Sequence, residues 1–114
     1  MSIKRGDLYL AALDPTLGHE ISKTRPVLVV SNDRNNAFSG TVTILPVSSK
    51  NLEKIYPFEV FLPKGTGNLP RDSKVKADQI RTIDRARLIK PIGSLGSTEM
   101  KEVEKAIRIH LEVP

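Results

Sequence analysis

The 114-residue sequence contains no cysteine and no tryptophan, and its only aromatic side chains are two tyrosines and three phenylalanines. Without cysteine, disulfides, thiolate zinc sites and cysteine nucleophiles are excluded. The few aromatics argue against a sheet that stacks RNA bases on an aromatic platform. No apolar run approaches the length that spans a membrane, and no apolar signal segment follows Met1. We therefore expect a cytoplasmic protein without membrane spans.

Recognisable metal and cofactor motifs are also missing. The two histidines, His19 and His110, lie far apart, and no paired ligand spacing accompanies them. The segment 65–68 contains two glycines, but no Lys-Ser or Lys-Thr pair follows it as in a phosphate-binding loop. The sequence therefore predicts neither a metal nor another cofactor.

Positive charge is in excess. The formal net charge is +5 and the pI is about 9.7, which favours a polyanionic partner because bound phosphates release counterions. Segment 71–90 carries +4 of this charge, as seven cationic residues against three carboxylates. They are Arg71, Lys74, Lys76, Arg81, Arg85, Arg87 and Lys90 against Asp72, Asp78 and Asp84. On charge alone, a binding surface and a solvated charge-rich face are equally good interpretations.

Short strand-like segments fill most of the chain. Val27–Val30 is a continuous run rich in β-branched residues, typical of a strand buried on both sides. We expect a polar turn or single helical turn at 32–36, and a turn at Thr82–Asp84 between the last two strands. The predicted strands are Asp7–Leu13, Pro26–Ser31, Thr41–Val47, Phe58–Leu62, Ser73–Ile80 and Ala86–Pro91.

The hydrophobic period changes to that of a helix near the C-terminus. Apolar residues recur there every three or four positions, which predicts an amphipathic helix with Ser97 or Thr98 as its N-cap. The stripe comprises Met100, Val103, Ala106, Ile107, His110 and Leu111, with Ile109 off it. Short strands followed by one helix predict a single mostly β domain over 1–114, a small antiparallel barrel with helices packed outside.

The longest polar connection, 14–25, holds groups that could act on a phosphodiester. Arg25 precedes Pro26, so its backbone is biased to extended geometry at the entrance of a strand. Its guanidinium suits the charge that develops on a phosphate, although an arginine paired with a carboxylate is the commoner structural role. His19 and Glu20 could transfer protons, but solvent exposure without a role is the starting expectation for a loop histidine.

Other polar residues are weaker candidates for the site. Ser48 and Ser49 close a predicted strand, where a hydroxyl binds a phosphate or forms a turn. Gln79 could hydrogen-bond a base, and Tyr56 could stack on one, although half-buried packing is commoner for tyrosine. Arg81 and Asp84 have the spacing of a local pair that stabilises a turn, and that interpretation is favoured for them.

Six segments, in the same order as in the family, resemble the MazF/Kid/PemK toxin ribonucleases. They are Arg5–Tyr9, Asp14–Glu20, Arg25–Ser31, Pro46–Ser49, Tyr56–Val60 and Asp78–Asp84. The resemblance implies an SH3-like, partly open antiparallel β-barrel with a C-terminal amphipathic helix and short extra helices, assembled as a homodimer. It also implies metal-independent, sequence-specific cleavage of single-stranded RNA such as mRNA, by attack of the ribose 2′-hydroxyl. The products would carry 2′,3′-cyclic phosphate and 5′-hydroxyl ends.

The resemblance also assigns roles to residues. Arg25 would be the transition-state cation and proton donor, and Ser48 the hydroxyl that assists at the phosphate. His19 and Glu20 match positions with acid–base roles in different family members. The expected RNA-binding residues are Thr24, Ser49, Tyr56, Lys76, Asp78 and Gln79.

Some positions depart from the family pattern. Ser48 stands where threonine is common, Thr24 where some members have a histidine, and Lys76 where the Kid branch has arginine. Asp78 matches the Kid carboxylate, so the Kid-type triad is only partly present and the general base is left open.

The expected partner is a MazE-like antitoxin whose acidic segment would cover the RNA groove. Two alternatives remain: a non-enzymatic inhibitor similar to the CcdB gyrase poisons, and an inactive RNA-binding SH3-like module. The CcdB poisons resemble one another in having a C-terminal tail that contains tryptophan, and this sequence contains no tryptophan.

Overall fold

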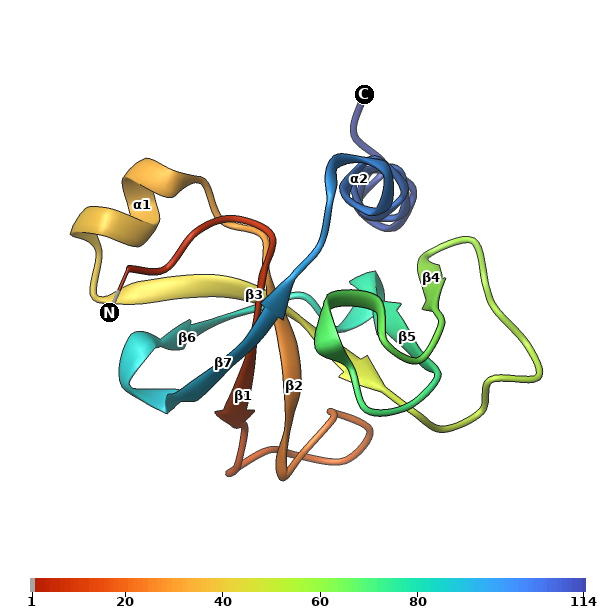
Figure 1. Cartoon of the computed structure of the whole chain (residues 1–114), viewed down its shortest axis with the longest axis horizontal. Helices are drawn as coiled ribbons and strands as arrows, with labels where there is room; N and C mark the ends of the chain where they lie inside the picture. The colour runs from red at the N-terminus through yellow and green to blue at the C-terminus, as the bar shows by residue number, and fades with distance from the viewer. Residues whose placement is uncertain (1) are drawn as a thin grey trace.

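A computed structural model describes residues 2–114 as an antiparallel β structure with two α-helices (Figure 1). The strands are β1 (Asp7–Ala12), β2 (Thr24–Val29), β3 (Thr41–Ser48), β4 (Glu59–Leu62), β5 (Ser73–Lys76), β6 (Arg81–Asp84) and β7 (Leu88–Ser94). The helices are α1 (Asp33–Phe38) and α2 (Ser97–Leu111). Single 3-10 turns lie at η1 (Thr66–Asn68), η2 (Ala77–Gln79) and η3 (Arg85–Arg87).

The strands follow the order β4-β5-β3-β2-β1-β7, and β6 pairs with β3 beside this path. β3 organises the sheet because its two ends have different partners: residues 41–44 pair with β6, and residues 47–48 pair with β5. All strand pairs of the described residues are antiparallel, and the sheet coils without closing. The predicted fold class, a mostly β, partly open barrel followed by a helix, is confirmed.

Two apolar clusters fill the space on either side of β2 and β3. Val27, Leu28 and Val29 are completely buried and supply both clusters, which confirms the predicted doubly buried strand. α2 covers one cluster with its buried residues Met100 and Val103 and with Ala106. In Figure 1, α1 and α2 lie toward one side of the sheet, and the loop between β1 and β2 projects from the other.

The C-terminal helix differs from its prediction at both ends. Its N-cap is Gly96 rather than Ser97 or Thr98, and the Glu99 carboxylate accepts a hydrogen bond from the Gly96 N–H at 2.9 Å. His110 and Leu111 are exposed although they continue the apolar period. The buried residues of α2 are Met100, Val103 and Ala106, so only the first three turns of the helix cover the core.

The predicted turn at Thr82–Asp84 is wrong, because these residues belong to β6. η2 ends β5 early and redirects the chain, so that β6 pairs with the opposite end of β3. The predicted Arg81–Asp84 pair is also wrong: Arg81 donates to the Leu13 carbonyl at 3.4 Å, and Asp84 caps η3 through the Ala86 N–H.

Among residues 2–114, the structure has no helix that is long and apolar enough to span a membrane.

Candidate functional site

Arg25 and Ser48 point to the same face of the sheet. β2 and β3 pair in the register Val27–Pro46, and each of the two residues lies two positions beyond that pair along its own strand. Because side chains alternate along a strand, both share the face of the Val27–Pro46 pair. Ser48 pairs across β3 and β5 with Lys74, and Glu59 pairs across β4 and β5 with Lys76. We call the surface formed by these five residues the Arg25 face.

The Arg25 guanidinium is half-buried and only partly satisfied. Its Nε–H donates to the Ser22 carbonyl at 2.7 Å, which fixes the side chain at the start of β2. Within residues 2–114, its terminal N–H groups have no hydrogen-bond partner and it makes no ion pair. The commoner role of a structural ion pair therefore does not apply to Arg25.

Ser48 is nearly buried at the end of β3, and its hydroxyl accepts a hydrogen bond from the Lys50 N–H at 3.2 Å. This contact turns the chain out of the strand. Ser49 points to the opposite face, where it lines a different pocket.

Three charges are held together beside Ser48. The Glu59 carboxylate, 1% exposed, binds Lys74 Nζ at 3.1 Å and Lys76 Nζ at 2.5 Å. Burial by itself raises the pKa of Glu59, but hydrogen bonds from Lys76, the Tyr56 backbone and Lys74 outweigh burial and lower that pKa below its usual value. Glu59 therefore stays ionised and offsets part of the positive charge of the two lysines.

A pocket of about 390 Å³ adjoins these charges, and we call it the Tyr56 pocket. Tyr56 and Phe58 stack with ring centres 5.4 Å apart, and Lys54 Nζ lies 4.8 Å from the centre of the Tyr56 ring. Asp78 lines the same pocket; its Oδ1 is buried, lies 3.8 Å from Lys76 Nζ, and has no hydrogen-bond partner among residues 2–114. The pocket thus combines a π-surface with cations and a carboxylate.

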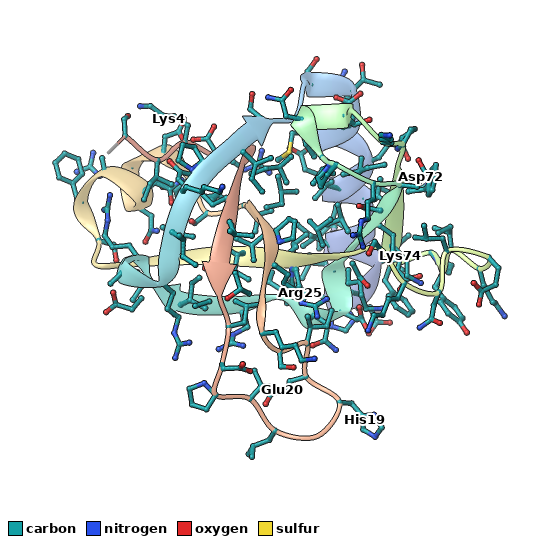
Figure 2. All side chains as sticks on the ribbon, turned by 60° about the horizontal axis from the view of Figure 1, so that its bottom comes forward. Lys4, His19, Glu20, Arg25, Asp72 and Lys74 are labelled. Atoms are coloured by element: carbon teal, nitrogen blue, oxygen red, sulfur yellow. The ribbon has the colours of Figure 1, made fainter. Side chains whose placement is uncertain are left out.

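The loop between β1 and β2 carries the two proposed acid–base residues. Figure 2 shows His19 at its outer tip, pointing away from the body of the molecule, and Arg25 back on the sheet. Glu20 is exposed, and its Oε1 accepts a hydrogen bond from the Leu17 N–H at 2.6 Å. Gln79 holds the loop end, because its Oε1 accepts from the Ile21 N–H at 3.2 Å. Neither His19 nor Glu20 lines the Tyr56 pocket, and neither lines the second pocket, described next, to which Arg25 contributes.

The opposite side of β2 and β3 forms a second pocket of about 560 Å³, which we call the Lys50 pocket. Thr24 and Ser49 line it, together with aliphatic side chains of β1 and β7. Its cationic residues are Arg25, Lys50, Arg71 and Lys90, and no carboxylate of the described residues lines it. Arg25 therefore lies at the boundary between the Arg25 face and the Lys50 pocket.

The basic segment 71–90 divides into residues that hold the fold and residues that face pockets. Arg85 donates to the Asn36 and Ser39 carbonyls at the end of α1, and Arg87 donates to the Ala12 and Asp14 carbonyls. Sequence reasoning missed Glu59 and Lys74 because nothing local pairs residues fifteen positions apart.

No group of three histidine, cysteine, aspartate or glutamate side chains in residues 2–114 is arranged to hold a metal ion.

The fold is that of a small, partly open β-barrel, and its cationic surface and partly unpaired arginine are suited to a polyanion. The chain belongs to the PemK-like, MazF-like toxins of type II toxin–antitoxin systems, whose family model matches residues 4–111. The family predicted from the sequence is therefore confirmed.

Individual relatives agree over nearly the whole chain. The endoribonuclease MazF9 of Mycobacterium tuberculosis (strain ATCC 25618 / H37Rv) is 40% identical, covering 97% of this chain and 98% of the relative. The crystal structure of MazF (Form-I) from Deinococcus radiodurans superposes with a TM-score of 0.85 at 31% identity, covering 99% of both chains. A MazE–MazF structure (Form-II) from the same organism gives 0.79 at 30% identity, covering 100% of this chain and 99% of the other.

Proposed function

We propose that this protein is the toxin of a toxin–antitoxin pair and acts as an endoribonuclease on single-stranded RNA, including mRNA. The family and the relative named as an endoribonuclease support the class of activity. The observation that carries the proposal is the free Arg25 guanidinium on the same face of the sheet as Ser48. A guanidinium with free terminal N–H groups, on the same face as a hydroxyl and at the edge of a cationic surface, is suited to a phosphodiester.

The proposed reaction needs no protein nucleophile and no metal or other cofactor. The ribose 2′-oxygen loses its proton and bonds to the neighbouring phosphorus, and the bond from phosphorus to the 5′-oxygen breaks. The leaving 5′-oxygen takes up a proton, which gives 2′,3′-cyclic phosphate and 5′-hydroxyl ends. The terminal N–H groups of Arg25 stabilise the added charge on the phosphate oxygens, and Ser48 donates a further hydrogen bond.

His19 and Glu20 are proposed as alternative acid–base groups. Both are on a loop whose side chains can reorient when RNA binds, since catalytic contacts often tighten only in the complex. Separate His19→Ala and Glu20→Gln variants assign the role: the proton-transfer residue is the one whose loss lowers kcat about 100-fold or more.

The proposed RNA-binding residues divide between two surfaces. Tyr56, Lys76 and Asp78 line the Tyr56 pocket, where a base can stack and form hydrogen bonds. Thr24 and Ser49 line the Lys50 pocket, and Gln79 anchors the loop that lies beside Arg25. A strand of RNA that passes Arg25 could thus contact both pockets.

The proposed partners are a second copy of this chain and a MazE-like antitoxin with an acidic segment, and the proposed location is the cytoplasm. The related MazE–MazF structure supports the antitoxin, and the net charge of +5 makes an acidic segment a complementary partner.

The proposed catalytic role of Arg25 can be tested by substitution. Purified wild-type protein should cleave single-stranded RNA in the presence of EDTA. Arg25→Ala should fold normally, because the half-buried guanidinium contributes one hydrogen bond to the described chain, and should cleave at least ~100-fold more slowly. Cleavage is followed on end-labelled RNA, and the ends are identified by their reactivity toward kinase and phosphatase.

Arg34→Ala is the matched control, because Arg34 is exposed on α1, away from both pockets. Its cleavage rate should stay within about twofold of wild type. Equal rates for wild type and Arg25→Ala would contradict the mechanism. If the wild type cleaves no RNA of varied sequence, the CcdB-like or inactive RNA-binding alternative is favoured instead.

A further inference from the structure

Lys74 is a charged side chain in an almost completely buried position, with 4% of the side chain exposed. Its ammonium donates to the Asn51 carbonyl at 2.9 Å, the Lys54 carbonyl at 3.2 Å and Glu59 Oε1 at 3.1 Å. An ammonium has three N–H donors, so each can have its own acceptor. A charge this deep is tolerated only when it is paired and its donors are satisfied, as they are here.

Two of the three acceptors belong to the loop between β3 and β4. In the described chain, the hydrogen bonds that hold residues 51–55 to other segments are the two from Lys74. The loop otherwise has its contacts at its ends, where Lys50 meets Ser48 and Tyr56 meets Glu59. Within the described residues, the middle of the loop is therefore held by the hydrogen bonds of one group, the Lys74 ammonium.

The same charge network reaches the aromatic wall of the Tyr56 pocket. Glu59 Oε1, which binds Lys74, also accepts the Tyr56 backbone N–H at 3.0 Å. Lys54, whose carbonyl binds Lys74, places its own ammonium over the Tyr56 ring. The position of Tyr56 relative to Asp78 on the other wall thus depends on where Lys74 holds the loop.

We propose that Lys74 is a positioning residue that sets the shape of the Tyr56 pocket and thereby determines which RNA base the pocket accepts. The proposal rests on the proposed ribonuclease function. Lys74 does not bind the base itself, because its three N–H donors are already bound to Asn51, Lys54 and Glu59. It acts on the base only by setting the position of the loop. Its removal should therefore relax the choice of base more than it slows the chemistry at Arg25.

The test compares wild type with Lys74→Met, which keeps the length of the side chain and removes its donors. Hydrogen–deuterium exchange should become at least about tenfold faster at the hydrogen-bonded amides of Lys50 and Tyr56, at the two ends of the loop, and stay unchanged in β1 and β2. The wild-type cleavage motif is first found by sequencing the ends of cut transcripts. The preference for that motif over RNAs with one substituted base should then fall about tenfold, because small misplacements are costly in oriented sites.

Lys101→Met is the control for the loss of one positive charge, because Lys101 is exposed on α2; both its loop exchange and its base preference should match wild type. If Lys74→Met does not fold, Lys74→Gln, which retains an amide donor, is measured in its place. Fast loop exchange with unchanged base preference would overturn the proposal, as would unchanged exchange.

Binding of labelled homopolymeric RNAs by the same variants separates this proposal from the proposed function. If wild type binds one homopolymer selectively but cleaves nothing, the ribonuclease proposal fails, and the loss of that selectivity in Lys74→Met still supports the role of Lys74. If wild type binds no RNA, both proposals are wrong.

Discussion

At the scale of single residues, cationic side chains on different elements differ in which groups they bind. Arg25 keeps its terminal N–H groups free on the face that it shares with Ser48, whereas Arg85 and Arg87 use theirs on backbone carbonyls. Lys74 and Lys76 both pair with the buried Glu59. A guanidinium bound to carbonyls supports the fold, while an unpaired one at a pocket is available to a ligand. Contacts, rather than residue type, thus separate the cations that support the fold from those that are free to bind a ligand.

The Glu59 network predicts the effect of removing one charge. Glu59→Gln would leave Lys74 without its carboxylate at a site with 4% exposure, so the free energy of unfolding should fall by about 3 kcal/mol. Urea unfolding followed by circular dichroism measures the loss. Glu53→Gln, an exposed control, should change it by less than about 0.5 kcal/mol. Equal values for the two variants would show that the buried pair does not stabilise the fold.

The same carboxylate predicts a pH dependence of stability. Its pKa is lower in the folded protein than in the unfolded chain, so its contribution is present above about pH 4.3, the usual glutamate pKa. The contribution is lost as the pH falls through the lowered folded pKa, because the unfolded chain then binds the proton more readily. Unfolding measured between pH 6 and 3 should show a smaller acid-induced loss for Glu59→Gln than for wild type.

At the scale of elements, the close approach of β7 to η1 positions one wall of the Lys50 pocket. A Cβ built on Gly93 would lie 2.3 Å from the Gly67 carbonyl oxygen, which is backbone and cannot rotate away. Asn68 then donates to the Ile92 carbonyl at 3.1 Å across the same junction, and both line the pocket. Only glycine at 93 allows the two elements to meet this closely.

Gly93→Ala should therefore separate β7 from η1 and lower the free energy of unfolding by about 2 kcal/mol. Gly40→Ala is the matched control, because no atom lies within 4 Å of a Cβ there, and its stability should stay within about 0.5 kcal/mol of wild type. Denaturant unfolding compares the two. A Gly93→Ala protein as stable as the control would mean that the junction adapts without cost.

At the scale of the whole molecule, where the net charge is +5, positive charge gathers around the Lys50 pocket, which four cationic residues and no carboxylate of the described residues line. Around the Tyr56 pocket, three cationic residues are balanced by three carboxylates. Single-stranded RNA that neutralises Z phosphates should bind with log K falling linearly with log salt, at a slope of about −0.7Z. The slope is measured by fluorescence anisotropy with Arg25→Ala, which avoids cleavage. A slope near zero would exclude the phosphate backbone as the main contact.

Local patterns in the sequence were enough to predict the family and the mostly β composition with its C-terminal helix, and they gave Arg25 as the proposed catalytic cation. Apolar runs such as Val27–Val29 and the period of α2 are local signals, and the proline after Arg25 fixes its extended backbone locally. The same local reasoning placed a turn at Thr82–Asp84, where pairing with β3 instead makes a strand.

Contacts between distant elements, which no local pattern predicts, set which cations are free and which hold the fold together. Arg25 shares a face with Ser48 because of the β2–β3 register, and Lys74 meets Glu59 because β4 and β5 pair. Such contacts join residues distant in sequence, and whether a charge is buried depends on every element around it. The loop that holds His19 and Glu20 likewise projects outward, so the proposed site centres on the strand ends rather than on the loop tip.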